Sequence, residues 1–530
     1  MLPSPWLRQA FVAVVFSFLI GTGQVYADAG DLDRAFGTDG KVTTDLSGRE
    51  DEARAVAIQS DGKIVAVGLS EGSNVDFAVA RYNVDGSLDT TFGNAGKVIT
   101  DFVGYADVAS SVVIQRDGKI VVAGYAGNGS NSDFALARYN LDGSLDTAFG
   151  IGGRVTTDFG REDRASIFLI QTDGNIVTAG TTGEASGRDF ALARYTQDGT
   201  LDITFGVGGK VTTDFFGETD RALALAIQTD GKIVMAGGAG TYPRSDFALA
   251  RYEAGGTLDV TFGNGGKVTT ELGGDETIHG LSIQSDGKII AHGFVTTGFG
   301  SDFGIARYNP DGTVDTAFGT RGKVVTSFGF HNYGSTLAVQ ADGRIVVAGF
   351  NDMGPIYDFV LARYTSDGAQ DSTFGTSGIV SSPFSGGDNW PNAVAMQADG
   401  KIVVVGYAEG SLEGDFAIVR YDSGVPAVSE VRFEPASVQA GSGFTATFSG
   451  INLSEQTYFD IRFRAPQSTT DEVIMNWQQG LSALRVIGSG TATGTWTLTG
   501  VRAHEHRDEH IGEFVSVPAA LVVAASRTAN

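Results

Sequence analysis

Asp133-Phe134-Ala135-Leu136-Ala137-Arg138-Tyr139 is the stretch that decides the fold, because it recurs seven times with small changes. Successive copies are 56 or 57 residues apart. A fixed period of this length indicates one supersecondary unit stacked many times. The Arg-Tyr pairs that end the copies are Arg81/Tyr82, Arg138/Tyr139, Arg194/Tyr195, Arg251/Tyr252, Arg307/Tyr308, Arg363/Tyr364 and Arg420/Tyr421.

Each repeat contains four short apolar segments separated by turn residues. In the second copy these segments are residues 110–115, 120–124, 133–139 and 154–157. Asp117-Gly118 lies between the first two, and Asp-Gly between apolar runs is a strong hairpin signal. No segment has helical length or period. Four antiparallel strands in each repeat predict the blade of a β-propeller.

The two ends of the repeat array predict how the ring closes. A Leu-Asp-x-x-Phe-Gly element follows each of the first six units, with Val314 in place of Leu the fifth time and Gln370 the sixth, and is missing after the seventh. An extra copy, from Leu32 to Gly37, precedes the first unit. We therefore expect residues 32–46 to supply the outer strand of the last blade, which closes seven blades and removes the exposed sheet edges.

The recurring Arg and the recurring Asp of this element are expected to pair. Arg138, for example, shares a strand face with Phe134, and the next blade should cover that face. A buried guanidinium requires a carboxylate, because an unpaired buried charge is costly. Asp146 is the natural partner, and the same pairing is expected in all seven units.

Three repeated blocks resemble the delta-60 repeat family of bacterial β-propellers. They are 145–150 (LDTAFG), 115–120 (QRDGKI) and 133–139 (DFALARY). The resemblance covers about residues 32–421. It implies the propeller fold and an exported bacterial protein, and it implies no catalytic residues.

The remaining segments predict export and a second domain. Residues 1–27 resemble a signal peptide, with Arg8 before a short apolar run and Val25-Tyr26-Ala27 at the expected cleavage site. We expect the propeller over 28–422, a linker over 423–427 and an immunoglobulin-like β-sandwich of alternating strands over 428–530. The mature protein would be secreted, periplasmic or on the bacterial cell surface, with no membrane span after signal cleavage.

Composition excludes several functions. The formal net charge of -25 argues against binding nucleic acid or anionic membranes. The chain has no cysteine, which excludes disulfides, thiolate zinc sites and cysteine nucleophiles.

One loop position just before the first strand of each repeat is acidic in five consecutive units: Asp51, Asp107, Asp163, Asp220 and Glu276. Oxygen ligands of this kind suit calcium, so these residues are candidate metal ligands near the mouth of the central channel. The alternative, which we favour, is that they cap turns, because a ring of about 10 Å radius is too wide for one ion. No other cofactor is expected.

The loops on the same side vary between repeats and carry aromatic residues such as Tyr333 and Trp390. Function tends to occupy variable loops on a rigid scaffold. We therefore expect an exported, non-catalytic binding or scaffolding protein whose loop face binds an extracellular protein or glycan. The alternative is an enzyme that acts on extracellular carbohydrate, with loop-face carboxylates as acid and base.

Overall fold

A computed structural model describes residues 28–184, 187–240, 244–297, 300–327, 332–351, 356–384, 386–410 and 413–424, and the backbone of eight further strands between 427 and 524. The predicted signal segment, residues 1–27, lies outside the described residues. No helix in the described part of the chain has the length and apolar character that crossing a membrane requires.

Seven antiparallel four-stranded sheets form the blades of a β-propeller, as predicted. The first strand of each blade runs along the central channel: β2 (Asp51–Ile58), β6 (Asp107–Ile114), β10 (Asp163–Ile170), β14 (Asp220–Ile227), β18 (Asp275–Ile283), β22 (Asn332–Val339) and β26 (Asn389–Met396). The second strands are β3 (Ile64–Glu71), β7 (Ile120–Gly127), β11 (Ile176–Thr182), β15 (Ile233–Ala239), β19 (Ile289–Thr297), β23 (Ile345–Asn351) and β27 (Ile402–Glu409).

The other two strands of each blade lie farther from the channel. The third strands are β4 (Val75–Tyr82), β8 (Ser132–Tyr139), β12 (Asp189–Tyr195), β16 (Asp246–Tyr252), β20 (Gly300–Tyr308), β24 (Asp358–Tyr364) and β28 (Gly414–Tyr421). The outer strands are β5 (Lys97–Thr100), β9 (Arg154–Thr157), β13 (Lys210–Thr213), β17 (Lys267–Thr270), β21 (Lys323–Thr326), β25 (Ile379–Ser382) and β1 (Lys41–Thr44).

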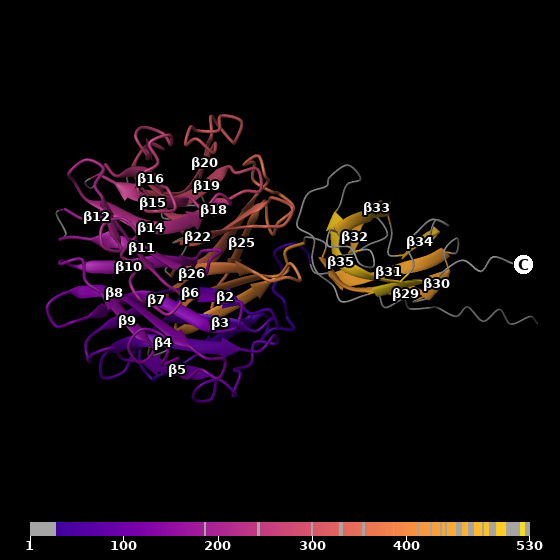
Figure 1. The fold of residues 1–530 in the computed structure, drawn as a ribbon, viewed down its shortest axis with the longest axis horizontal. Helices are drawn as coiled ribbons and strands as arrows, with labels where there is room; N and C mark the ends of the chain where they lie inside the picture. The colour runs from indigo at the N-terminus through magenta and orange to yellow at the C-terminus, as the bar shows by residue number, and fades with distance from the viewer. Residues whose placement is uncertain are drawn as a thin grey trace, which may run out of the picture.

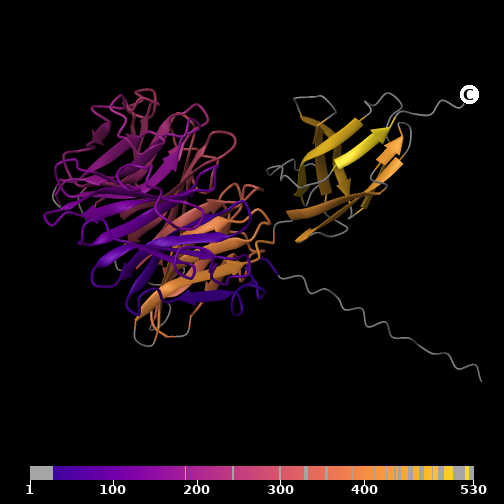
Figure 2. The same cartoon turned by 60° about the horizontal axis from the view of Figure 1, so that its bottom comes forward.

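The ring closes through the N-terminal strand, as the repeat order predicted. β1 pairs antiparallel with β28, with Lys41 opposite Val419, and Leu32 bridges Tyr421. The indigo start of the chain therefore lies beside the orange last blade in both views (Figures 1 and 2). The Tyr82 hydroxyl donates to Thr44 across the junction at 3.0 Å. The last blade thus has four strands and no open edge.

Apolar side chains fill the space between neighbouring blades. Phe77 of one blade packs with Ala109 of the next in one buried cluster, and both side chains are fully buried. Both faces of each blade are covered in this way, which explains strands such as β7 that are apolar throughout. The rigid stack holds the first strands around the channel.

The predicted Arg–Asp pairs are confirmed in all seven blades, with Nε–Oδ2 distances of 2.7 to 2.9 Å. Each guanidinium also stacks on the Phe of the Phe-Gly element, as Arg138 does on Phe149 at 4.5 Å. It then donates to a backbone carbonyl of the following blade, as Arg138 does to Gln197. One side chain therefore links the turn of its own blade to the next blade.

The strands after residue 427 form two further sheets. The first has the order β29-β31-β34 and the second the order β30-β36-β35-β32-β33, with β30 and β36 parallel. The strands are β29 (Ala427–Glu434), β30 (Ser437–Gln439), β31 (Gly443–Ile451), β32 (Tyr458–Arg464), β33 (Asp471–Gln479), β34 (Ser482–Val486), β35 (Gly494–His504) and β36 (Ala520–Ala524).

Candidate functional site

A β-bulge interrupts the first strand of every blade at the same position. In β6 the pairing with β7 shifts between Ala109 and Ser111, so Ser110 has no partner residue. A bulge of this kind re-aims the extra side chain. All seven bulged residues line one cavity of about 700 Å³ in the central channel. They are Arg54, Ser110, Ser166, Leu223, His279, Ser335 and Asn392, which we call the bulge ring.

A glycine in the second strand makes room for each bulge. A Cβ on Gly124 would lie 1.9 Å from the carbonyl oxygen of Val108, which rules out any other residue without a backbone shift. Gly180, Gly237 and Gly349 meet the same obstacle in their blades. The backbone geometry of the ring is therefore repeated seven times, whereas its side chains differ from blade to blade.

Aromatic side chains gather on one side of the channel mouth. Phe294, Tyr333 and Phe350 line the cavity, and Tyr333 stacks on Phe350 at 5.0 Å between ring centroids. Tyr357 and Trp390 continue the row, since both rings contact Phe350. Trp390 in turn stacks on Tyr407 at 4.6 Å and an interplanar angle of 10°. We call these six residues the aromatic arc.

Charged groups line the cavity in the first blades. The Glu52 carboxylate accepts hydrogen bonds from Arg54 at 2.9 Å and from Asn392 at 3.0 Å. Burial opposes the charge on Arg54, but Glu52 offsets this effect and raises the pKa of the guanidinium. Arg164 lies over the Tyr125 ring at 5.0 Å. The cavity thus combines aromatic rings with charged groups fixed in place.

His279 of the bulge ring is uncharged at neutral pH. Burial and the charge of Arg221 lower the pKa of its imidazole to about 4. The ring lies 5.3 Å from Phe294, between centroids. It adds an uncharged, hydrogen-bonding group beside the aromatic arc.

The five acidic positions singled out in the sequence lie elsewhere. Asp51, Asp107, Asp163, Asp220 and Glu276 are fully buried, and none lines the cavity. Each accepts backbone N–H groups of the preceding loop: Asp107 binds the Phe102 amide at 2.7 Å, and Glu276 binds three amides. The turn-capping interpretation therefore describes their hydrogen bonds.

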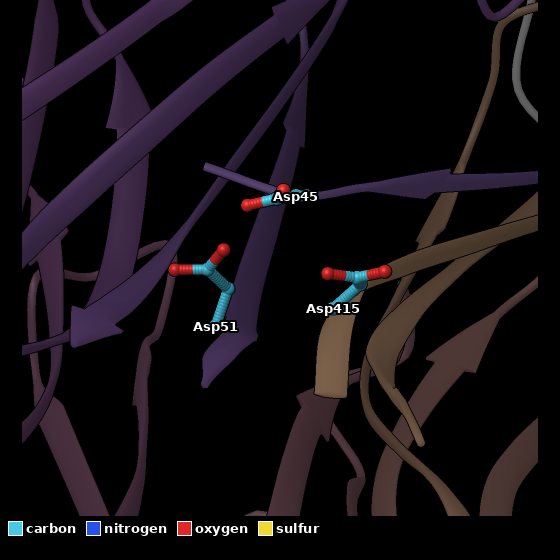
Figure 3. Close-up of side chains that lie close together, drawn as sticks. All are labelled: Asp45, Asp51 and Asp415. Atoms are coloured by element: carbon cyan, nitrogen blue, oxygen red, sulfur yellow. The ribbon is translucent and has the colours of Figure 1, made fainter. Parts of the chain in front are cut away.

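Four of these residues also meet two further carboxylates at the junction between blades. Both come from the preceding blade: one lies at the start of its third strand, and the other lies just after the end of its outer strand. Their oxygen atoms lie within 4.8 Å of one another, as for Asp45, Asp51 and Asp415 at the ring closure (Figure 3). The other acidic clusters are Asp76–Asp101–Asp107, Asp133–Asp158–Asp163 and Asp189–Asp214–Asp220. The predicted ring is thus a set of separate clusters, each small enough for one ion.

A family model described as a domain of unknown function (DUF5122) beta-propeller matches seven segments of the chain. They are residues 59–92, 115–149, 171–205, 228–262, 284–318, 340–374 and 397–424. The delta-60 resemblance is consistent with this match, which covers the repeats of the propeller. A comparison with curated proteins found no match.

Proposed function

We propose that this chain, a member of the DUF5122 beta-propeller family, is an exported, non-catalytic binding or scaffolding protein. Its loop face would bind a protein or glycan partner. The family itself has no assigned function. A β-propeller repeat domain fits a binding or scaffold role. The features of residues 1–27 support export to the periplasm, the medium or the cell surface. The two sheets after residue 427 would form an immunoglobulin-like module that spaces or attaches the propeller.

The observation that carries the proposal is the aromatic arc beside the polar bulge ring. Binding pockets combine apolar and aromatic walls with a few fixed polar groups. Phe294, Tyr333 and Phe350 provide the walls, while Arg54 and Asn392 provide donors held by Glu52. A sugar presents both C–H faces and hydroxyl groups. A glycan is therefore the partner that this cavity suits best.

The enzyme alternative receives less support. Acid–base hydrolysis of a glycoside requires two carboxylates about 5 to 10 Å apart on either side of the bond. Glu52 is the single carboxylate among the described residues that line the cavity. It is also held by Arg54 and Asn392. The acidic positions of the sequence are buried away from the cavity.

A glycan array probed with the purified full chain tests the proposal. Ser166→Trp would fill the cavity without removing a core contact, and Trp390→Ala would shorten the aromatic arc. Each should weaken binding at least tenfold. Tyr105→Ala is the matched control, because this exposed loop aromatic does not line the cavity. Unchanged binding by both channel variants, or glycan binding by none of the proteins, would overturn the proposed site.

A further inference from the structure

In two acidic clusters, the fully buried carboxylate at the start of the blade's first strand has an oxygen without a hydrogen-bond partner among the described residues. Asp107 is fully buried, and its Oδ2 accepts the Phe102 amide, but its Oδ1 has no partner. The amide of Gly127 is close enough to act to lower the pKa of Asp107, but its hydrogen bond goes to the Ala106 carbonyl at 2.9 Å. A buried, unpaired carboxylate oxygen is costly unless something satisfies it.

Asp220 repeats this arrangement two blades away. Its side chain is fully buried, its Oδ2 accepts the Phe215 amide at 2.7 Å, and its Oδ1 is again without a partner. The amide of Gly240 likewise acts to lower the pKa of Asp220, but its hydrogen bond goes to the Thr219 carbonyl at 3.2 Å. The same unsatisfied atom therefore occurs in two independent blade junctions.

The protein's own cations do not neutralise these clusters. Arg154 donates to the backbone carbonyls of Asp101 and Phe102, at 2.5 and 3.4 Å. In the second cluster, Lys267 donates to the carbonyl of Asp214 at 2.5 Å. In the described part of the chain, neither cluster contains an ion pair with Lys or Arg. Each therefore brings three carboxylates together without an ion pair, although the charge of Arg161 acts to lower the pKa of Asp189 in the second cluster.

We propose that a divalent cation of the calcium type binds in each of the clusters Asp76–Asp101–Asp107 and Asp189–Asp214–Asp220 and joins two neighbouring blades. Asp76 and Asp101 belong to the blade of β2–β5, whereas Asp107 begins the next blade. Two oxygens on one calcium ion, each at about 2.4 Å, lie at most about 4.8 Å apart. The oxygens of each cluster all lie within 4.8 Å of one another. An all-oxygen donor set favours calcium over zinc.

Burial and neighbouring carboxylates oppose the negative charge of Asp107 and of Asp220. Burial, and then the charges of Asp101 and Asp76, raise the pKa of Asp107 to about 6. Burial, and then Asp214 and Asp189, raise the pKa of Asp220 to about 6. A bound cation would relieve this repulsion and keep the carboxylates ionised.

The other two clusters provide internal controls. Asp163 uses both oxygens, because the Thr182 hydroxyl donates to Oδ1 and the Phe159 amide to Oδ2. Asp51 accepts hydrogen bonds from the Ser47 hydroxyl and from the Leu46 amide. Asp133, which shares the cluster of Asp163, has an unpaired Oδ1. Because the first-strand carboxylates Asp51 and Asp163 are themselves satisfied, both clusters are expected to bind the ion much more weakly.

Calcium titration of the chelator-treated full chain by calorimetry tests the inference. The wild type should bind at least two ions. Asp107→Asn and Asp220→Asn should each bind one fewer, the double variant two fewer, and Asp163→Asn should match the wild type. Asp76→Asn removes a ligand of the first site without touching the loop cap of Asp107. It should therefore also lose one ion even if Asp107→Asn folds poorly, which melting in chelator will show.

Three results would overturn the inference. They are no calcium binding by the wild type, the same stoichiometry in Asp76→Asn and Asp220→Asn as in the wild type, or an equal loss in Asp163→Asn. The readout does not depend on any ligand in the channel, so it is separate from the test of the proposed function.

Discussion

The guanidinium of Arg420 binds the carboxylate of Asp33, with Nε–Oδ2 at 2.8 Å and Nη2–Oδ2 at 2.7 Å, across a sequence separation of 387 residues. Lys401 reaches the same oxygen at 2.9 Å. The pair is the seventh copy of an interaction that the other six blades make within one repeat. It shows that the start of the chain completes the last blade with the same contacts as an ordinary outer segment.

Removing the closing segment should destabilise the whole ring. Deletion of residues 28–46 leaves the last blade with three strands, a bare edge along β28, and Arg420 without Asp33. Because an open hydrophobic edge invites pairing between molecules, we expect a lower melting temperature and aggregation. Thermal melting with light scattering measures both. If the deletion variant melted at the same temperature as the wild type, closure by the N-terminal strand would contribute nothing to stability.

The Arg–Asp pairs should contribute different amounts to stability, depending on whether a second cation also binds the Asp carboxylate. Asp146 keeps Lys119 at 2.8 Å, whereas Asn175 occupies the equivalent position beside Asp202. Arg194→Met should therefore lower the free energy of unfolding by about 3 kcal/mol, which is the lower end for a broken buried ion pair. Arg138→Met should lower it by about 1 kcal/mol less, because Lys119 still pairs with Asp146. Urea unfolding measures the difference, with the exposed Arg161→Met as control. Equal losses in both variants would contradict the role given to the second cation.

The same pairs should make the fold sensitive to acid. Burial acts to raise the pKa of Asp259, but hydrogen bonds from Lys232 and Thr261 and the charge of Arg251 lower it below its usual range. A carboxyl with a lowered folded pKa stabilises the fold above its unfolded pKa, near 3.8, and loses this contribution as pH falls through the folded value.

The difference between two proteins isolates this effect. Between pH 7 and pH 3, Asp259→Asn should lose less stability in urea unfolding than the wild type, because the wild-type carboxyl begins to take up a proton in the unfolded state over this range and the variant has no such carboxyl. Parallel loss of stability in the two proteins would mean that Asp259 has the same pKa in the folded and unfolded states.

Most of the fold could be predicted from the repeat. The period gave seven blades, the stray Leu32–Gly37 element gave the closing strand, and the recurring Arg and Asp gave their pairing. These features depend on local pattern and on the need to pair buried charge. They do not require knowledge of how adjacent blades are rotated.

Part of the aromatic arc was anticipated, since Tyr333 and Trp390 were singled out on the variable loops. The bulge ring and the acidic clusters were missed, because they depend on a backbone irregularity and on contacts between blades. Ser110 and its equivalents face the channel owing to the bulge, and regular alternation would not place them together. A signal was nevertheless present: a glycine such as Gly124 inside an otherwise apolar strand often marks a bulge or a close backbone approach. Asp76 and Asp101 were not linked to Asp107, since they meet it only across a blade junction.

Tryptophan emission during a glycan titration tests the central claim most directly. Trp390 is the single Trp in the repeats and belongs to the aromatic arc. We predict that adding a glycan selected on the array changes the tryptophan fluorescence of the full chain, and that the change reaches a plateau as the glycan concentration rises. The change should vanish in Trp390→Phe, and binding should fall at least tenfold in Ser166→Trp. Full-strength binding with unchanged emission, and with no loss in Ser166→Trp, would contradict a binding site at the channel mouth.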